Sequence, residues 1–268
     1  MAVAIAPEAA VSSREVAVQL VDVTKVFGSG AQAVLAVDGL NLEIYRGELV
    51  CLLGASGCGK STVLNLIAGL ERATRGQVVV PAASTCLMFQ ESALFPWLTV
   101  NGNVAMPLRL QRRRRADRDA EVQRLLELVR LEKFGGHRPH QLSGGMRQRV
   151  NLARALAIDP EILLMDEPFA ALDAQTREIM QTELLRIWER GQKTVLFVTH
   201  QIDEAVFLSD RVLVFARRPG RVQAEIKIPL PRPRHLDIKR TPEFVALVDR
   251  IWRMIEDDVR AAALYENA

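Results

Sequence analysis

Short apolar runs of the length of a β-strand recur along the chain. Residues 48–53, 161–166 and 194–199 are almost continuously apolar, which is typical of parallel strands buried on both faces of a sheet. Residues 16–23 and 40–44 instead alternate apolar and polar positions, which predicts antiparallel strands with one face in solvent. Further strands are predicted from the shorter apolar runs at residues 76–81, 85–90, 211–215 and 222–228.

Apolar residues with helical spacing lie between and after these runs. Residues 62–68 follow the first continuous run, and residues 150–158 precede the second. Residues 116–129 predict an amphipathic helix with a charged outer face; its apolar face consists of Val122, Leu125, Leu126 and Val129. A last helix is predicted after the cap at residues 241–243. We expect its apolar face to pack back on the domain, through Phe244, Leu247, Val248, Ile251 and Ile255.

The composition narrows the class of protein. Of 268 residues, 49% are hydrophobic and 25% charged, with a formal net charge of +3, close to an average globular protein. This length suits one large α/β domain with insertions. No apolar run approaches the roughly 20 residues of a membrane span, and residues 1–6 lack the basic leader of a signal peptide. The three cysteines form no CxxC pair, which fits a reducing compartment, so we expect a cytosolic chain.

A glycine-rich loop follows the first continuous run. Gly54 and Gly59 are separated by four residues and followed by Lys60 and Ser61, the pattern of a phosphate-binding P-loop. The glycines let backbone N–H groups face phosphate oxygens, and the next helix adds partial positive charge at its N-terminus. A glycine turn without a ligand is the alternative, which the strand–loop–helix order disfavours. We therefore expect ATP to contact Gly54, Ala55, Ser56, Gly57, Cys58, Gly59, Lys60, Ser61 and Thr62.

Polar residues end three other apolar runs. Asp166 and Glu167 follow each other at a strand end, where unpaired buried charge is costly. Bound Mg²⁺ would stabilise Asp166, and Glu167 would orient or deprotonate the attacking water. Gln90 offers a carboxamide that reaches a metal or its water. His200 lies on the rim where open α/β sheets bind ligands, and its imidazole can hydrogen-bond a γ-phosphate. The alternatives are a solvated turn and a structural histidine.

Two further residues each have a functional and a structural interpretation. Ser143 precedes two glycines at the start of a helix, which predicts either a second anion site made of open backbone amides or a simple N-cap with a glycine turn. Phe27 precedes the flexible segment 28–30. Its ring either stacks on adenine or belongs to the core, because aromatic side chains bury a large area in any case.

The stretch between Gln90 and Ser143 holds an apolar cluster and a basic run. Residues 92–100 carry large apolar side chains around Pro96, so they either fold onto the core or form an exposed docking patch. Residues 112–115 are four consecutive arginines. We interpret them as a solvated face, because the chain is near neutral and lacks the interleaved aromatic residues of a nucleic-acid-binding segment.

These motifs occur in the order found in the ATP-binding-cassette (ABC) ATPases, which the chain resembles from about residue 16 to residue 228. The resemblance implies a P-loop NTPase fold of the α/β class, with a mixed β-sheet core, an antiparallel β-subdomain and an α-helical signature subdomain. Residues 15–228 then form the nucleotide-binding domain. Residues 1–14 are expected to be a flexible extension, and residues 229–268 a C-terminal tail with an amphipathic helix.

The resemblance also implies roles for single residues. Phe27 matches the adenine-stacking aromatic and Asp173 the D-loop, and the catalytic group consists of Glu167, His200 and Gln90. The implied metal ligands are Ser61, Gln90 and Asp166. The family works as a head-to-tail dimer, in which one subunit completes the ATP site of the other through Leu142, Ser143, Gly144, Gly145 and Met146. Met146 replaces the commoner Gln, which leaves the implied contacts of Ser143 and Gly145 intact.

A narrower resemblance is to the ATPases of nitrate, sulfonate, taurine and bicarbonate importers, through residues 94–100, 173–177, 219–221 and 231–234. It implies ATP hydrolysis coupled to uptake of a small anion, at the cytoplasmic face of the plasma membrane. The implied partners are transmembrane permease subunits, a periplasmic or lipid-anchored solute-binding protein and a second ATPase subunit, identical or related. An exporter ATPase and a non-transport family member are the alternatives; the latter is disfavoured because about 50 residues between Gln90 and Leu142 are too few for a long coiled coil.

Overall fold

Nine strands and seven α-helices are present in the computed structural model, which describes residues 15–82, 84–191, 193–217 and 219–266. The strands are β1 Val16–Phe27, β2 Val34–Tyr45, β3 Leu49–Leu53, β4 Arg75–Val79, β5 Thr85–Met88, β6 Ile162–Asp166, β7 Thr194–Thr199, β8 Arg211–Phe215 and β9 Val222–Lys227. The helices are α1 Lys60–Ile67, α2 Val100–Leu110, α3 Arg115–Leu128, α4 Gly144–Ala157, α5 Ala174–Gly191, α6 Ile202–Leu208 and α7 Pro242–Glu266. The predicted extension, residues 1–14, lies outside the described residues.

A six-stranded sheet in the order β5-β6-β7-β3-β8-β9 forms the centre of the fold. Its strands are parallel except β9, which pairs antiparallel with β8. Every residue of β3 and β7 is buried, as their continuous apolar sequences predict. Because neighbouring strands are parallel, the carboxyl ends of β3, β5, β6 and β7 lie along one edge of the sheet, the edge at which α/β folds bind ligands.

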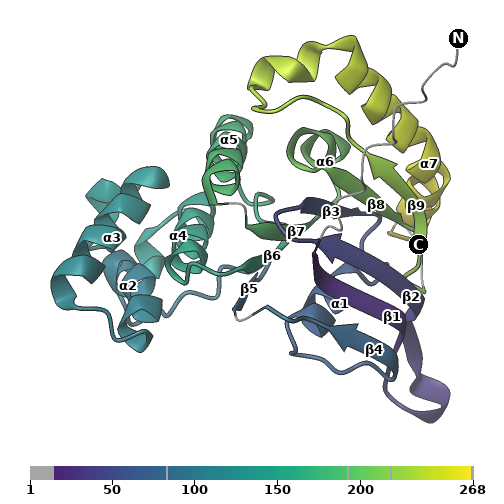
Figure 1. The fold of residues 1–268 in the computed structure, drawn as a ribbon, viewed down its shortest axis with the longest axis horizontal. Helices are drawn as coiled ribbons and strands as arrows, with labels where there is room; N and C mark the ends of the chain where they lie inside the picture. Colours follow the sequence, from purple (N-terminus) through teal and green to yellow (C-terminus); the bar gives the residue numbers. More distant parts are fainter. Residues whose placement is uncertain (1–14, 83, 192, 218, 267–268) are drawn as a thin grey trace, which may run out of the picture.

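A second sheet, in the order β2-β1-β4, is antiparallel throughout and confirms the predicted antiparallel subdomain. Its buried residues alternate with exposed ones along β2, because one face packs on apolar residues and the other meets solvent. Figure 1 shows this sheet on one side of the central sheet and the helices α2, α3 and α4 grouped on the other. The predicted combination of a mixed core, an antiparallel subdomain and a helical subdomain is therefore confirmed.

Three helices and one strand differ from what the sequence pattern predicts. Those predicted at residues 62–68, 116–129 and 150–158 are present as α1, α3 and α4, whereas α2, α5 and α6 were not anticipated. The strand predicted at residues 85–90 ends earlier, at Met88, because its partner β6 pairs with it only as far as Met165. Gln90 therefore lies in the loop after the strand.

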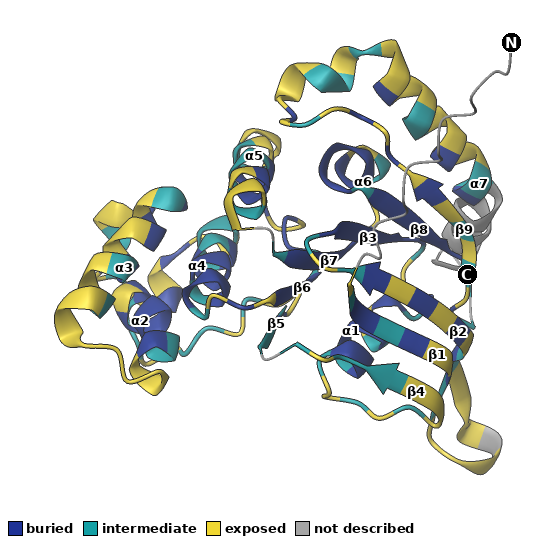
Figure 2. Ribbon diagram, in the orientation of Figure 1, coloured by how far each residue is buried: buried dark blue, intermediate teal, exposed yellow. Residues whose placement is uncertain are grey.

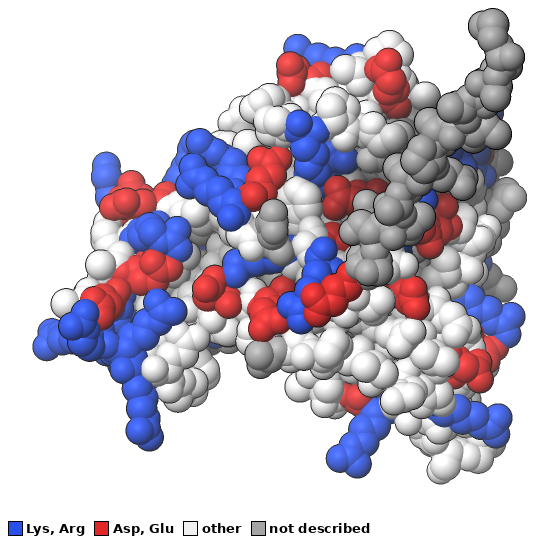
Figure 3. Space-filling model, viewed as in Figure 1, with Lys and Arg blue, Asp and Glu red and all other residues white. Residues whose placement is uncertain are grey.

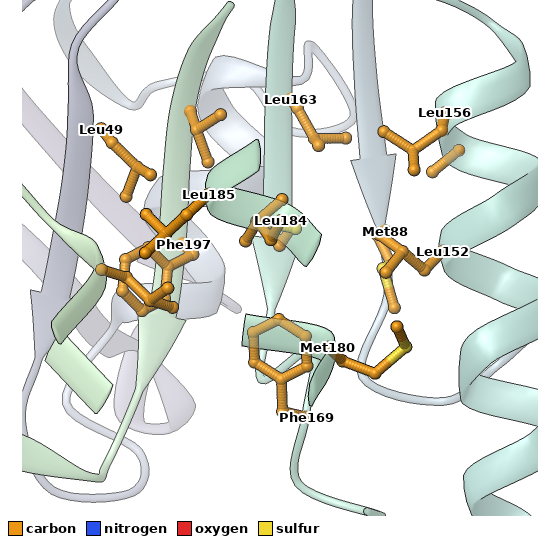
Figure 4. Packing of buried hydrophobic residues seen from close by; sticks show 14 of the residues in the cluster. Leu49, Met88, Leu152, Leu156, Leu163, Phe169, Met180, Leu184, Leu185 and Phe197 are labelled. Atoms are coloured by element: carbon orange, nitrogen blue, oxygen red, sulfur yellow. The ribbon is translucent and has the colours of Figure 1, made fainter. Parts of the chain in front are cut away.

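Two apolar cores lie on opposite faces of the central sheet, and β3 supplies both. Leu49, Cys51 and Leu53 belong to the larger core with residues of α2 to α7, while Val50 and Leu52 face the core shared with α1 and the antiparallel sheet. Figure 4 shows part of the larger core, where strand residues such as Phe197 meet Leu184 and Leu185 of α5. In Figure 2 the central strands are buried along most of their length.

The basic run, residues 112–115, connects the end of α2 to the first residue of α3 at the far end of the helical group. The side chains of Arg114 and Arg115 are 85% and 88% exposed, and they pair with Asp117 and Asp119 on the next turn. Figure 3 shows basic side chains gathered at this end of the molecule. These contacts support the interpretation of the run as a solvated face. No helix within the described ranges is long and apolar enough to cross a membrane.

The C-terminal segment packs on the domain, as predicted for its last helix. Phe244, Ile251 and Ile255 of α7 are buried in the larger core. Arg234 is also buried, and its guanidinium donates hydrogen bonds to five backbone carbonyls, those of Val206, Phe207, Ser209, Ile228 and Leu230. Burial lowers the pKa of Arg234 to about 10, so it remains charged at neutral pH. This side chain fastens the C-terminal segment to the end of α6.

Replacing Arg234 by Met tests that role. Arg234→Met removes the shared donor, and we expect the free energy of unfolding to fall by about 2–4 kcal/mol because buried carbonyls lose their partners. The exposed Arg250→Met is the matched control and should change stability by less than about 0.5 kcal/mol. Denaturant titration measures both variants. Equal stability of the two would contradict the anchoring role of Arg234.

Candidate active site

The loop between β3 and α1 closes around the side chain of Lys60. Gly57 and Gly59 have φ angles of 74° and 99°, a region that favours glycine. A Cβ atom on Gly59 would lie 2.6 Å from the carbonyl oxygen of Ala36, so the close approach of β2 also requires glycine there. The buried Lys60 donates through Nζ to the carbonyls of Gly54 and Ala55, each at 2.8 Å. The loop therefore places an ammonium at the N-terminus of α1, where anions bind.

A pocket of about 200 Å³ opens beside this loop. It is lined by Phe27, Val34, Ala36, Gly57, Gly59, Lys60, Ser61 and Thr62. Phe27 is 38% exposed, and the Lys25 ammonium lies 4.6 Å from its ring centroid. The alternative that Phe27 is an ordinary core residue is therefore wrong. Its ring borders the space next to the loop, where a flat apolar group can stack on it.

Glu167 is held between two side chains that come from other strand ends. Its Oε1 lies 3.2 Å from Nδ1 of His200, and its Oε2 accepts a hydrogen bond of 3.1 Å from Nε2 of Gln90. Glu167 follows β6, His200 follows β7 and Gln90 follows β5. The backbone of Glu167 has a φ of 45°, and its N–H donates to the carbonyl of Val198. His200 and Gln90 thus fix the orientation of both carboxylate oxygens of Glu167 at the ligand-binding edge of the sheet.

Asp166 ends β6 beside the loop. Burial raises its pKa, a hydrogen bond with the Ser61 side chain opposes this shift, the Glu167 carboxylate adds to it, and the Lys60 charge opposes it. The structure therefore brings Ser61 and Asp166 together, as the sequence predicts. A partly buried carboxylate with a raised pKa is stabilised by any cation that binds next to it.

The predicted second anion site begins helix α4. Ser143 is the N-cap, and its Oγ accepts a hydrogen bond from the Met146 N–H at 3.2 Å. A Cβ atom on Gly145 would lie 3.2 Å from Leu172, so this helix start packs against the loop that leads to Asp173. Asp173 caps α5 through the Thr176 N–H, and that hydrogen bond lowers its pKa. Within the described residues, none of residues 142–146 lines the pocket beside Lys60.

The apolar stretch 92–100 both folds onto the core and remains accessible. Val100 is buried and Leu94 packs against the larger core, whereas Trp97 is 68% exposed. Phe95 borders a pocket of about 510 Å³. That pocket is mostly apolar and is lined by Cys86, Leu87, Phe89, Ala93, Phe95, Met106, Pro107, Leu110, Gln111, Asn151, Arg154, Ala155 and Ile158.

Sequence reasoning missed the residues that hold this stretch in place. The buried Asn103 of α2 accepts from the Phe95 N–H and donates to carbonyls of residues 95, 98 and 99. Arg154 of α4 donates to the carbonyls of Ser92 and Ala93. An isolated asparagine within an apolar helical segment is the signal that would have found the first of them, because a buried amide requires partners.

The sequence also carries no signal for Arg177, which contacts the residue after His200. Arg177 of α5 donates to the side chain of Gln201 at 3.0 Å and to the carbonyl of Leu172 at 2.9 Å. It thereby joins the segment after β7 to the loop before Asp173. Neither contact is visible in the sequence, because each depends on how α5 packs on the sheet.

Comparison with known proteins places this site in a family. The family profile described as ABC transporter matches residues 37–170. An uncharacterized ABC transporter ATP-binding protein of Methanocaldococcus jannaschii is 46% identical over 91% of this chain and 93% of its own length. A nitrate import ATP-binding protein of Synechocystis and a taurine import ATP-binding protein of Burkholderia pseudomallei are each 44% identical over 88% of this chain, covering 94% and 96% of their own lengths.

Among solved structures, a dimeric ATP-binding cassette bound to ADP and Pi in a post-hydrolysis state is similar. It has a TM-score of 0.74 and 35% sequence identity, and the match covers 80% of this chain and 100% of that one. The fold, the loop around Lys60 and these relatives agree. The chain therefore belongs to the ABC transporter family, as an ATP-binding subunit whose ATP hydrolysis is coupled to transport.

Proposed function

We propose that this chain is the ATP-hydrolysing subunit of an importer for a small anion. The observation that supports the anion is that near-full-length relatives at 44% identity are named for import of nitrate and of taurine. Both solutes carry a compact oxyanion group, as do other sulfonates and bicarbonate. Uptake measurements distinguish these solutes, because no residue of an ATPase subunit needs to contact the solute.

The pocket beside Lys60 is proposed to bind ATP. Phe27 would stack on the adenine ring, and the amides of residues 54–59 with Thr62 would surround the phosphates. The Lys60 ammonium, now on the carbonyls of Gly54 and Ala55, would turn to the β- and γ-phosphates. Cys58 is buried at the base of the loop, which fits a packing role.

Glu167 is proposed as the general base of hydrolysis. With its two oxygens oriented by Gln90 and His200, the carboxylate can accept the proton of a water that attacks the γ-phosphorus. His200 is half-exposed, with 51% of its side chain accessible, so its ring can also hydrogen-bond a γ-phosphate oxygen. When ATP binds, Gln90 would shift and would move residues 92–100, the loop that follows it.

Magnesium fits the residues at the end of β6. Mg²⁺ prefers oxygen ligands and keeps several waters, and Ser61, Asp166 and Gln90 supply a hydroxyl, a carboxylate and an amide oxygen. The raised pKa of Asp166 supports a cation there, because a bound cation offsets the cost of its ionisation. Within the described ranges, no group of three or more His, Cys, Asp or Glu residues could hold a metal ion. The ion would neutralise charge on the phosphates.

A second ATPase subunit is proposed to complete the site. Ser143, Gly144 and Gly145 present a capped helix N-terminus away from the pocket of their own chain, and a partner's γ-phosphate would supply the anion that it lacks. Leu142 and Met146 would support that contact, and Asp173 would lie at the dimer interface. The partner is an identical or a related cassette.

The apolar pocket of about 510 Å³ beside Phe95 is proposed to receive a helix of a permease subunit. Its apolar lining and the exposed Trp97 suit an amphipathic helix. The pocket is lined by Phe89, Ala93 and Phe95, on both sides of Gln90, so a shift of Gln90 on ATP binding would alter its shape. Such docking would hold the subunit at the cytoplasmic face of the membrane, beside a permease that a solute-binding protein supplies.

Replacing Glu167 by Gln tests the general base. Glu167→Gln keeps the volume and the contacts with Gln90 and His200, so ATP should still bind, while the rate of phosphate release falls by about 100-fold or more. The ATP-bound dimer should then accumulate and be visible by light scattering. Lys60→Ala, in contrast, should weaken nucleotide binding itself. Wild-type turnover in Glu167→Gln would refute the assignment.

Asp166→Asn tests the metal ligand through stability. Because the folded-state pKa of Asp166 is raised, its stabilising contribution is present at low pH and is lost as pH rises through that pKa. At pH 7, without nucleotide, Asp166→Asn should therefore have a higher Tm than wild type, and the difference should shrink as pH falls below the ordinary carboxyl range. Mg²⁺ with ATP should raise the Tm of wild type more than that of the variant. The exposed Asp203→Asn is the control, and identical behaviour of both variants would contradict the proposal.

Uptake identifies the solute. Cells of the source organism carrying wild-type protein or Glu167→Gln take up labelled nitrate, taurine, an alkanesulfonate or bicarbonate. We expect the variant to abolish uptake of one of the four. If all four persist while the purified wild-type protein hydrolyses ATP, the anion importer is wrong, and export becomes the alternative to test.

A further inference from the structure

The proposed mechanism gives no role to Glu204, a deeply buried carboxylate. Glu204 of α6 is 3% exposed. Its Oε1 accepts a hydrogen bond of 3.0 Å from Nε2 of Gln181, and its Oε2 accepts the hydroxyl of Thr199. Burial raises the pKa of Glu204, and the hydrogen bonds from Thr199 and Gln181 act in the opposite direction. A carboxylate in this position is tolerated only while both partners stay in place.

Thr199 connects this carboxylate to the site. It is the last residue of β7 and directly precedes His200, and its Oγ1 also accepts the backbone N–H of Gln201 at 3.1 Å. The residues on both sides of His200 are therefore fixed by one hydroxyl. That hydroxyl is itself oriented by Glu204, so the position of the imidazole next to Glu167 depends on a side chain that touches neither residue.

The hydrogen-bond chain continues to the C-terminal segment. Gln181 of α5 is 1% exposed, and its Oε1 accepts a hydrogen bond of 3.3 Å from Nζ of Lys239. Lys239 lies in a short 3₁₀ helix, Leu236–Arg240, and its ammonium is 4.8 Å from the ring centroid of Phe207 on α6. Four side chains thus link the C-terminal segment to the residue before His200. Hydrogen bonds in such a network polarise and strengthen one another, so each side chain helps to hold its partners in place.

We propose that Glu204 and Thr199 are positioning residues for hydrolysis, which keep His200 within reach of Glu167, and that Gln181 and Lys239 extend this control to the C-terminal segment. The inference rests on the proposed role of His200. It makes the segment after β9 part of the machinery that sets the rate of hydrolysis. A contact of that segment with another protein would then change turnover without touching the nucleotide.

Two substitutions at Thr199 test the first half of the chain. Thr199→Val has nearly the same shape but no hydroxyl, and it should lower kcat by about tenfold while KM for ATP changes by less than about twofold, because ATP contacts are intact. Thr199→Ser keeps the hydroxyl and should restore kcat to near wild type. Glu204→Gln keeps the volume of Glu204 and should lower kcat less than Thr199→Val does. Unchanged kcat in both Thr199→Val and Glu204→Gln would overturn the proposal.

A double-mutant cycle separates positioning from general damage. If Thr199 acts through His200, then Thr199→Val should cause no further loss of single-turnover rate in a His200→Ala background. An equal loss in both backgrounds overturns the positioning role. If His200→Ala alone hydrolyses ATP at the wild-type rate, the proposed role of His200 fails first, and that result is distinguishable because Thr199→Val is not involved in it.

The C-terminal end of the chain has its own matched pair. Lys239→Met removes the donor to Gln181 but keeps an aliphatic side chain over Phe207, and it should lower kcat by about threefold with KM unchanged. Arg240→Met changes an exposed neighbour and should leave kcat as in wild type. Equal kcat in these two variants would overturn the link to the C-terminal segment.

Discussion

The parallel pairing of β3, β5, β6 and β7 is the constraint on which the rest of the site depends. Only because these strands run in the same direction do the loop around Lys60, Gln90, Glu167 and His200 meet at one edge. The apolar sequences that bury the strands on both faces also fix their ends. A register shift of one residue in β6 or β7 would remove the carboxylate or the imidazole from the site.

Two carboxylates are wholly or partly buried near this edge of the sheet, and the cost of burying each one is offset in a different way. Asp166 and Glu204 are carboxylates in surroundings that raise their pKa, and neither position is favourable for a charge in a nucleotide-free chain. Asp166 is placed where a cation and phosphates would offset that cost. Glu204 is instead satisfied within the fold, by Thr199 and Gln181. The surroundings of Asp166 therefore suit ligand binding, and those of Glu204 suit a rigid support.

Much of the fold and the site could be predicted from the sequence. The glycine pattern at residues 54–61 and the acids that end β6 identify chemistry because their residue types are unfavourable elsewhere. The helices α2 and α5 could not be placed as readily. In α2, Pro107 interrupts the pattern expected of a helix interior. Glu204 resembles an ordinary acid in a short helix, and only the packing of α5 against α6 buries it beside Gln181.

Ser143 of one chain is proposed to complete the ATP site of another. The direct measurement is the molar mass in solution, with ATP and Mg²⁺, of Glu167→Gln and of the double variant Glu167→Gln/Ser143→Arg. We predict a dimer for the first and a monomer with undiminished ATP binding for the second, because the long cation would occupy the space of the partner's γ-phosphate. A dimer of equal stability in both proteins would contradict the head-to-tail site.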